Sequence, residues 1–247
     1  MSKSFPVFLL ASSAALTAVA AFAAPVTVPT GLNPGDQYRL AFVTSGIRNA
    51  TSIDIADYNV FVTSAAGSVP ELAALPTTWR AIASIEYGVE DNEGGFTIFQ
   101  DHARDNTATN PDVSAGFPIY RLDNTKIAVS NADLWDGNLL APLNRSETME
   151  IIAGSVWTGT ATDGQLDPDH NWRPLGPFFA DATRGTTLAA NAGWLTAGGV
   201  DPLNELHFYA ISGILTVPVP EPGTMILACL GFTGFVAVAI QKRRRVV

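Results

Sequence analysis

Two uncharged apolar runs lie near the ends of the chain, and between them short segments alternate hydrophobic and polar residues. The first run covers residues 5–20 and follows a single positive residue, Lys3. This order is typical of a secretory signal peptide, and Ala21 and Ala23 supply the small-residue site at which such a peptide is cleaved. We therefore expect residues 1–23 to be a signal peptide that is removed during export.

The second apolar run, residues 224–240, contains no charged residue. As a helix it would rise about 25 Å, the short end of the range for a bilayer crossing. A basic tail follows it, made of Lys242, Arg243, Arg244 and Arg245. Positive residues stay on the cytoplasmic side, so the pattern predicts a transmembrane helix with the preceding domain outside. A buried core helix with a basic end is the open alternative.

Between these runs, the pattern up to residue 84 predicts two strands and two helices. Residues 25–35 form an entry linker, and Tyr38, Leu40 and Phe42 alternate with other residues, which indicates a strand over 37–44. Apolar residues at helical spacing predict a helix that starts after a cap at Thr51 or Ser52 and ends near residue 66. A capping box that begins at Ser68 predicts a second short helix through residue 75. A strand is expected over 78–84.

The later part of the pattern is richer in strands and loops. Seven acids against one base mark residues 86–117 as a long acidic loop. A hairpin is expected from 119–122 and 126–129, further strands at 154–160, near Trp194 and at 206–217, and irregular stretches at 131–143 and 161–190. Because the helices come early and most strands late, we predict an α+β domain with two helices, a twisted, mainly antiparallel sheet and long loops.

The residues directly before the second apolar run form a short motif, Pro220-Glu221-Pro222. Two prolines lack N–H donors and favour an extended, accessible backbone. This motif, the apolar span and the basic tail in that order resemble the PEP-CTERM sorting signal of Gram-negative bacteria, over residues 218–247. The resemblance implies an exosortase, a membrane-embedded processing enzyme, as partner, with an inner-membrane intermediate and a final place at the cell surface or outside the cell. A rigid linker before an ordinary anchor is the alternative.

Four segments of the central region resemble a second family: LAFVTS at 40–45, YRLDNT at 120–125, ADLWDG at 132–137 and VWTGT at 156–160. They are similar to the endostatin-like branch of C-type-lectin-like domains in bacterial surface proteins. The resemblance covers residues 36–217 and implies an α+β fold with two helices and long irregular loops. The tripeptides with which calcium-dependent lectins read sugars are absent, so calcium-dependent sugar binding is not implied.

Charge and cysteine content change the picture of the exported part. The chain of 247 residues has a net charge of −9, but without Lys3, the basic tail and Glu221 the domain keeps 9 basic and 22 acidic residues, a net charge near −13. Such a surface argues against nucleic acid as a partner. The single cysteine, Cys229, lies in the expected span, so the domain has neither a disulfide nor a cysteine zinc site.

Sequence motifs for catalysis or metal binding are missing from residues 25–218. We find no Gly-x-Ser-x-Gly, no His-Glu-x-x-His and no phosphate-binding loop. Three carboxylates within 162–169 could bind calcium, but their spacing misses the EF-hand pattern, and solvated turns are the preferred interpretation. The histidines His102, His170 and His207 lie far apart in sequence, the first two in loops and the third in a strand. Trp135, Trp157 and Trp194 are expected in the core and Trp172 at the surface.

These observations predict an exported, non-catalytic surface or matrix protein with no cofactor and no metal site. It is expected to be sorted and processed by an exosortase, and to associate with exopolysaccharide through its lectin-like domain. Two alternatives stay open. One is a secreted glycan hydrolase that uses paired carboxylates, which needs two carboxyls about 5–9.5 Å apart. The other is a permanently anchored binding protein.

Overall fold

A computed structural model describes residues 23–90, 96–167, 171 and 173–220 of the chain. Most of the expected signal peptide, the expected span 224–240 and the basic tail 242–245 lie outside this part, as do Glu221, Pro222 and Cys229. Among the described residues, no helix combines the length and the apolar character that a membrane crossing requires. The transmembrane helix thus stays a prediction from the sequence.

Strand β1 (Gln37–Val43) lies in the middle of the main sheet and confirms the strand predicted over 37–44. It pairs antiparallel with β10 (His207–Ser212), with Ala41 opposite Ile211, and parallel with β5 (Ile119–Arg121). The strand order is β6-β5-β1-β10-β7-β8-β9. The remaining strands of this order are β6 (Lys126–Ala128), β7 (Ser155–Trp157), β8 (Ala182–Thr186) and β9 (Gly198–Val200).

Two further strands complete the main sheet, β2 (Trp79–Ala81) beside β10 and β11 (Leu215–Thr216) beside the start of β1. Most strand pairs are antiparallel, and β1–β5 and β10–β7 are parallel. The mixed α+β class and the mainly antiparallel sheet are therefore confirmed. The single strand expected over 206–217 is interrupted, because the register against β1 shifts by one residue between the Ala41–Ile211 and Tyr38–Leu215 pairs, and the Leu40 N–H bonds to the Ser212 side chain instead of to a backbone carbonyl.

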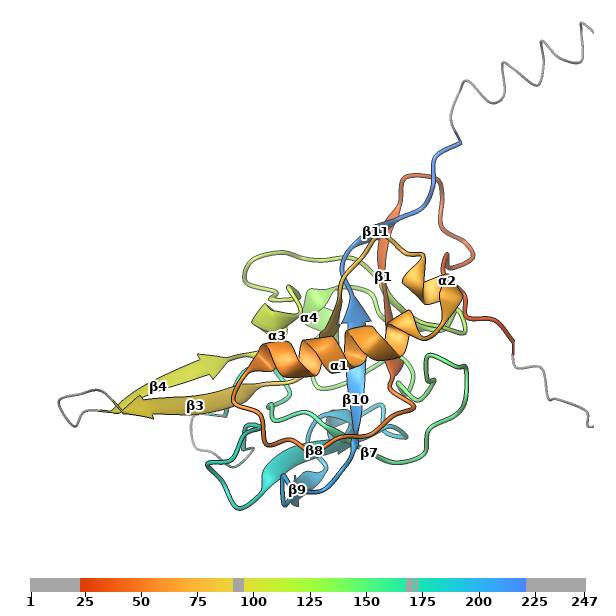
Figure 1. The fold of residues 1–247 in the computed structure, drawn as a ribbon. Coiled ribbons are helices and arrows are strands. Elements are labelled where there is room, and N and C mark those ends of the chain that lie inside the picture. Colours follow the sequence, from red (N-terminus) through yellow and green to blue (C-terminus); the bar gives the residue numbers. More distant parts are fainter. Residues whose placement is uncertain (1–22, 91–95, 168–170, 172, 221–247) are drawn as a thin grey trace, which may run out of the picture.

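Helix α1 (Ile55–Gly67) crosses one face of the sheet (Figure 1). The expected cap at Thr51 or Ser52 is wrong: the Asp54 carboxylate accepts the Ala56 N–H at 2.8 Å, while the Thr51 hydroxyl donates to the Asn49 side chain. Helix α2 (Pro70–Ala73) starts without a side-chain cap. The hydroxyl of Ser68 donates to the Ala65 carbonyl and so closes α1 rather than opening α2.

Further helical turns replace some of the predicted loops. They are α3 (Ala103–Asn106), α4 (Asn131–Leu134) and the 3-10 turn η1 (Ala192–Trp194). The strand expected near Trp194 is wrong, because the Asn191 side chain accepts the Gly193 N–H and starts a helical turn. The hairpin predicted around 123–125 is confirmed by β5 and β6, whereas β8 falls inside the stretch expected to be irregular.

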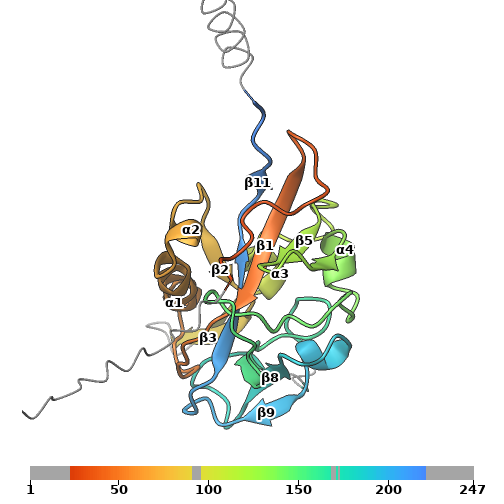
Figure 2. The same cartoon turned by 90° about the vertical axis from the view of Figure 1, so that its right-hand side faces the viewer.

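The core has two parts, one on each face of the sheet. Tyr38, Leu40 and Phe42 point toward α1 and pack with Tyr58 and Phe208. On the opposite face, Ala41 and Val43 pack in a second cluster with Ile119, Trp135, Trp194, Tyr209 and Ile211. Figure 2 shows the same division, with α1 on one side of β1 and α4 on the other. Because β1 is covered on both faces, most of its residues are apolar, whichever face they point to.

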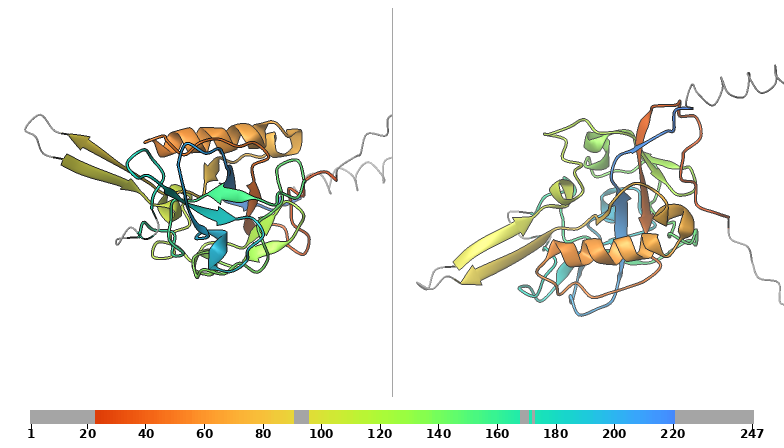
Figure 3. Two further views of the ribbon diagram at one scale, coloured as in Figure 1. Left: turned by 90° about the horizontal axis from the view of Figure 1, so that it is seen from below. Right: turned by 45° about the horizontal axis from the view of Figure 1, so that its top comes forward.

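Strands β3 (Ile85–Glu90) and β4 (Phe96–Asp101) form a separate two-stranded sheet. This hairpin protrudes from the body of the domain (Figures 1 and 3). The prediction of one long acidic loop over 86–117 is thus wrong for these strands. The acids counted there alternate with residues such as Tyr87, which stacks on Phe99 with ring centroids 5.1 Å apart.

Candidate functional site

The chain leaves the sheet at Val217, directly after β11. Val217 is 8% exposed. Its N–H donates to the Asp36 carbonyl at 2.9 Å, and its carbonyl accepts the Gly35 N–H at 3.0 Å. Val217 is therefore held from both sides of its backbone and is the last residue of the domain that the sheet fixes.

A tight turn at 33–36 makes this attachment possible. The Asp36 N–H bonds to the Asn33 carbonyl at 3.0 Å, and Pro34 and Gly35 occupy the two central positions. Gly35 has φ +92°, a value that the third residue of a type II turn requires and that glycine adopts without strain. The Asn33 N–H donates to the Asp36 carboxylate at 2.7 Å, which closes the turn from the other side. The predicted entry linker 25–35 thus ends in a structured turn.

Beyond Val217 the described chain is exposed. Pro218, Val219 and Pro220 all lie at the surface, and the Val219 side chain is 62% exposed. Proline offers no N–H to a strand partner and keeps the residue before it extended. The strand pairing therefore ends at the prolines. Pro220 is the first residue of the predicted sorting motif, and Glu221 and Pro222 lie outside the described residues.

A small apolar groove lies beside this exit. Its volume is about 330 Å³, and Val28, Pro76, Ile214 and Pro218 contribute to its walls. The hydroxyl of Tyr38, which also lines it, donates to the Thr27 carbonyl at 2.6 Å, and burial raises the pKa of this phenol. The groove therefore offers apolar contact rather than acid–base chemistry.

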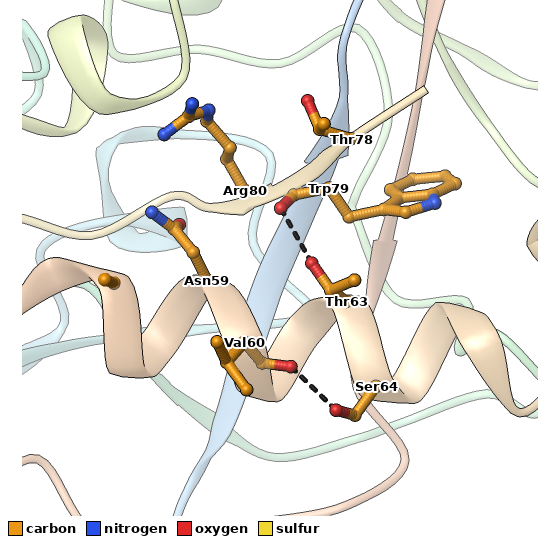
Figure 4. Close-up of a pocket in the computed structure, with 8 residues that line it drawn as sticks. Asn59, Val60, Thr63, Ser64, Thr78, Trp79 and Arg80 are labelled. Atoms are coloured by element: carbon orange, nitrogen blue, oxygen red, sulfur yellow. Dashed lines mark hydrogen bonds between the residues drawn. The ribbon is translucent and has the colours of Figure 1, made fainter. Parts of the chain in front are cut away.

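A second groove, of about 360 Å³, lies between α1 and β2 (Figure 4). Figure 4 shows that two of its hydroxyls bond to backbone carbonyls: Thr63 donates to the Trp79 carbonyl at 3.1 Å and Ser64 to the Val60 carbonyl at 2.8 Å. The residues that line it include Arg80 but no acid, histidine or cysteine. Such a lining can form hydrogen bonds to a ligand, but it has no group for general acid–base catalysis.

The candidate calcium segment at 162–169 is only partly described. Asp163 accepts hydrogen bonds from the backbone N–H and the side-chain amide of Gln165, both at 3.0 Å, a pattern of a carboxylate that stabilises a turn. Asp169 lies outside the described residues. Within the described part of the chain, no group of three or more acids, histidines or cysteines is arranged to hold a metal ion.

The described histidines have structural partners. Nδ1 of His102 accepts the Leu166 N–H at 3.0 Å, so this residue ties α3 to the 161–167 segment rather than being a solvated loop residue. His207 begins β10, as predicted for a strand, and its Nδ1 lies 2.7 Å from the Thr44 carbonyl. His170 lies outside the described residues.

One carboxylate–hydroxyl pair was not predicted from the sequence. The buried Glu147 carboxylate, 2% exposed, accepts both the N–H and the hydroxyl of the exposed Ser45. The two residues are 102 positions apart, and no local motif joins them. His207 lies close by, but its Nδ1 is directed at the Thr44 and Gly46 carbonyls. The geometry fits a carboxylate that anchors the loop after β1.

The tryptophans expected in the core are there. Trp157 and Trp194 are fully buried and Trp135 is 5% exposed. The indole N–H of Trp157 donates to the Arg48 carbonyl, and that of Trp135 donates to Thr109. Their faces are therefore not available to a ligand. Trp172, predicted at the surface, lies outside the described residues.

Comparison with known proteins bears on the C-terminal exit. A family model described as the PEP-CTERM protein-sorting motif matches residues 218–245. No curated protein matches the chain significantly. The match begins one residue after Val217, where the sheet releases the chain. The chain thus carries a PEP-CTERM sorting motif, which implies exosortase-dependent sorting of an exported surface protein.

Proposed function

We propose that this chain is a non-catalytic component of the cell surface or extracellular matrix that an exosortase processes at Pro220-Glu221-Pro222. The observation that carries the proposal is the position of the motif. Val217 is fixed by the sheet, and the described residues after it, 218–220, are exposed. A processing enzyme can therefore approach the motif without unfolding any part of the domain.

Covalent geometry supports processing close to the membrane. Residues 217 and 224 are seven positions apart, which corresponds to at most about 25 Å of extended chain. The folded domain would therefore lie near the bilayer surface while the expected span 224–240 is inserted. A membrane-embedded enzyme would reach the motif at the bilayer surface. The basic tail 242–245 would keep the span oriented with its C-terminal end in the cytoplasm.

The non-catalytic part of the proposal is supported by the chemistry of the two grooves described above. The groove in Figure 4 contains no acid or histidine. A glycan hydrolase would need a carboxyl with a raised pKa in a pocket. The pKa of Asp123 is lowered rather than raised. Burial opposes the ionisation of this carboxyl, but hydrogen bonds from Arg121 and Thr125 lower its pKa to about 2. Its partners are those of a structural ion pair.

Association with exopolysaccharide is the least direct part of the proposal. It is supported by the resemblance of residues 36–217 to lectin-like domains and by the exported location. A glycan-array measurement on the processed protein, with and without calcium, tests it. Binding to acidic or neutral polysaccharide in either condition is expected. No binding in both conditions would remove this part and leave the sorting proposal intact.

The sorting proposal is tested by the mass of the mature protein in hosts with and without an exosortase. With the enzyme, we expect a C-terminus near residue 222. Without it, the chain should keep its tail in the membrane fraction. A Glu221→Ala, Pro222→Ala double variant should stay unprocessed in both hosts, and a matched Pro218→Ala variant should be processed normally. An intact tail on the wild-type protein in both hosts would instead indicate a permanently anchored protein.

A further inference from the structure

The hairpin β3–β4 has an edge that no strand covers within the described part of the chain. Its base is attached to the body, where the Glu86 N–H bonds to the Leu175 carbonyl at 3.4 Å on the β3 side. One edge of β4 pairs with β3, and its other edge pairs with no described strand. Figures 1 and 3 show the hairpin extending away from the main sheet. An uncovered edge of this kind is a template for another strand.

The side chains of residues 97–100 on β4 are exposed and uncharged. Thr97, Ile98, Phe99 and Gln100 are all exposed, with Ile98 at 57% and Phe99 at 44%. The only charge on β4 is at its last residue, Asp101. Natural edge strands are usually protected by charges, proline or a bulge. β4 has no proline, and its register with β3 runs without interruption over six residue pairs.

We propose that β4 pairs with β4 of a second copy of this chain, antiparallel and about a two-fold axis at Ile98. A two-fold axis perpendicular to the sheet requires a residue to face its own copy, and Ile98 is the centre of the uncharged stretch 96–100. Ile98 then lies opposite Ile98 of the second copy, and Thr97 lies opposite Phe99. Asp101 lies three residues from the axis on each copy, so the two Asp101 side chains do not face each other.

This pairing would also stabilise the part of the hairpin that protrudes from the body. Two strands alone are only marginally stable in water, whereas three or more strands with an apolar face are stable. Pairing produces a four-stranded sheet, β3-β4-β4-β3, on which the stacked Tyr87 and Phe99 rings of each copy form part of one face. A second copy fits this edge because the uncharged stretch 96–100 meets the same stretch of the partner, while Glu86 and Glu90 lie on β3, the outer strand of the four.

Cysteine cross-linking in the cell envelope tests the register with the full chain. In a Cys229→Ser background, Ile98→Cys places two thiols opposite one another, within the ~4.5–5.5 Å between Cβ atoms of facing residues. A matched Gln100→Cys variant lies on the same face, but its two thiols are about 13 Å apart along the strands. A short thiol-specific cross-linker should yield at least five times more dimer with Ile98→Cys than with Gln100→Cys. Equal yields, or none, would overturn the proposal.

A second measurement does not depend on cross-linking. Sedimentation of the full chain in detergent micelles should show a dimer for the wild type. Ile98→Lys places two like charges opposite one another and should raise the dimer dissociation constant about tenfold or more. Val113→Lys, at a residue that is 82% exposed outside the hairpin, should leave it unchanged. A monomeric wild type, or equal effects of the two lysines, would contradict β4 pairing.

Discussion

Asp123 stabilises the turn between β5 and β6 through charge as well as hydrogen bonds. Arg121 donates to its two oxygens at 2.8 and 2.6 Å, and Nε of Arg145 lies 3.3 Å from Oδ2. Burial opposes the charged form, but hydrogen bonds from Arg121 and Thr125 and the charge of Arg121 outweigh it, so the pKa is about 2 in the folded protein. A carboxyl with a lowered pKa stabilises the fold above its unfolded pKa of about 4, and this contribution is lost as the pH falls toward 2.

Asp123→Asn should therefore lower the free energy of unfolding at pH 7 by about 1–2 kcal/mol, a value reduced for the solvent screening of a partly exposed pair. The difference from the wild type should shrink as the pH falls toward 2 and become small only below that value. Urea unfolding at pH 7 and pH 1.5 measures both values. Glu205→Gln, at an exposed loop position, is the control and should change little at either pH. A deficit of the same size at both pH values would show that charge is not the cause.

The start of α1 shows, at the level of an element, why a local pattern can name the right helix and the wrong cap. Thr51, Ser52 and Asp54 are all suitable capping residues, and the choice among them depends on where the chain turns into the helix. Asp54 has φ −119° and ψ 118° and bonds to the Ala56 N–H. Asp54→Ala should cost about 1 kcal/mol of unfolding free energy. Thr51→Ala should cost less, and thermal or urea unfolding that gives the reverse order would contradict this assignment.

The hairpin β3–β4 was missed for a different reason. Apolar and polar residues alternate from Ile85 to Glu90, which is a strand signal, but the number of acids and glycines in 86–117 favours a loop when it is counted over a long window. The paired strands β1 and β10 were predicted individually, yet their neighbours were not. Residues 41 and 211 face each other across 170 positions, and periodicity carries no information on such contacts. The same holds for Ser45 and Glu147.

At the scale of the whole molecule, the sequence was most informative where function depends on order along the chain rather than on folding. An apolar span, a basic tail and a proline motif can be read directly, and the matched residues 218–245 confirm the motif. What only the structure supplies is the distance between that motif and the folded domain. The described chain is exposed for just three residues, 218–220, between the buried Val217 and the rest of the motif.

This short connection makes the length of the exit a testable part of the sorting proposal. Three residues reach at most about 10 Å, so deleting Pro218 and Val219 would bring the motif against the Asn33–Asp36 turn and the groove beside it. An enzyme embedded in the membrane would then collide with the domain, and the processed fraction should fall at least tenfold in an exosortase host. Inserting Gly-Ser-Gly between Val219 and Pro220 should leave processing intact, because it moves the domain away without changing the motif. Intact-mass measurement of both variants decides the matter: normal processing of the deletion variant would show that the folded domain does not limit access, and failure of the insertion variant would show that the enzyme reads the domain as well as the motif.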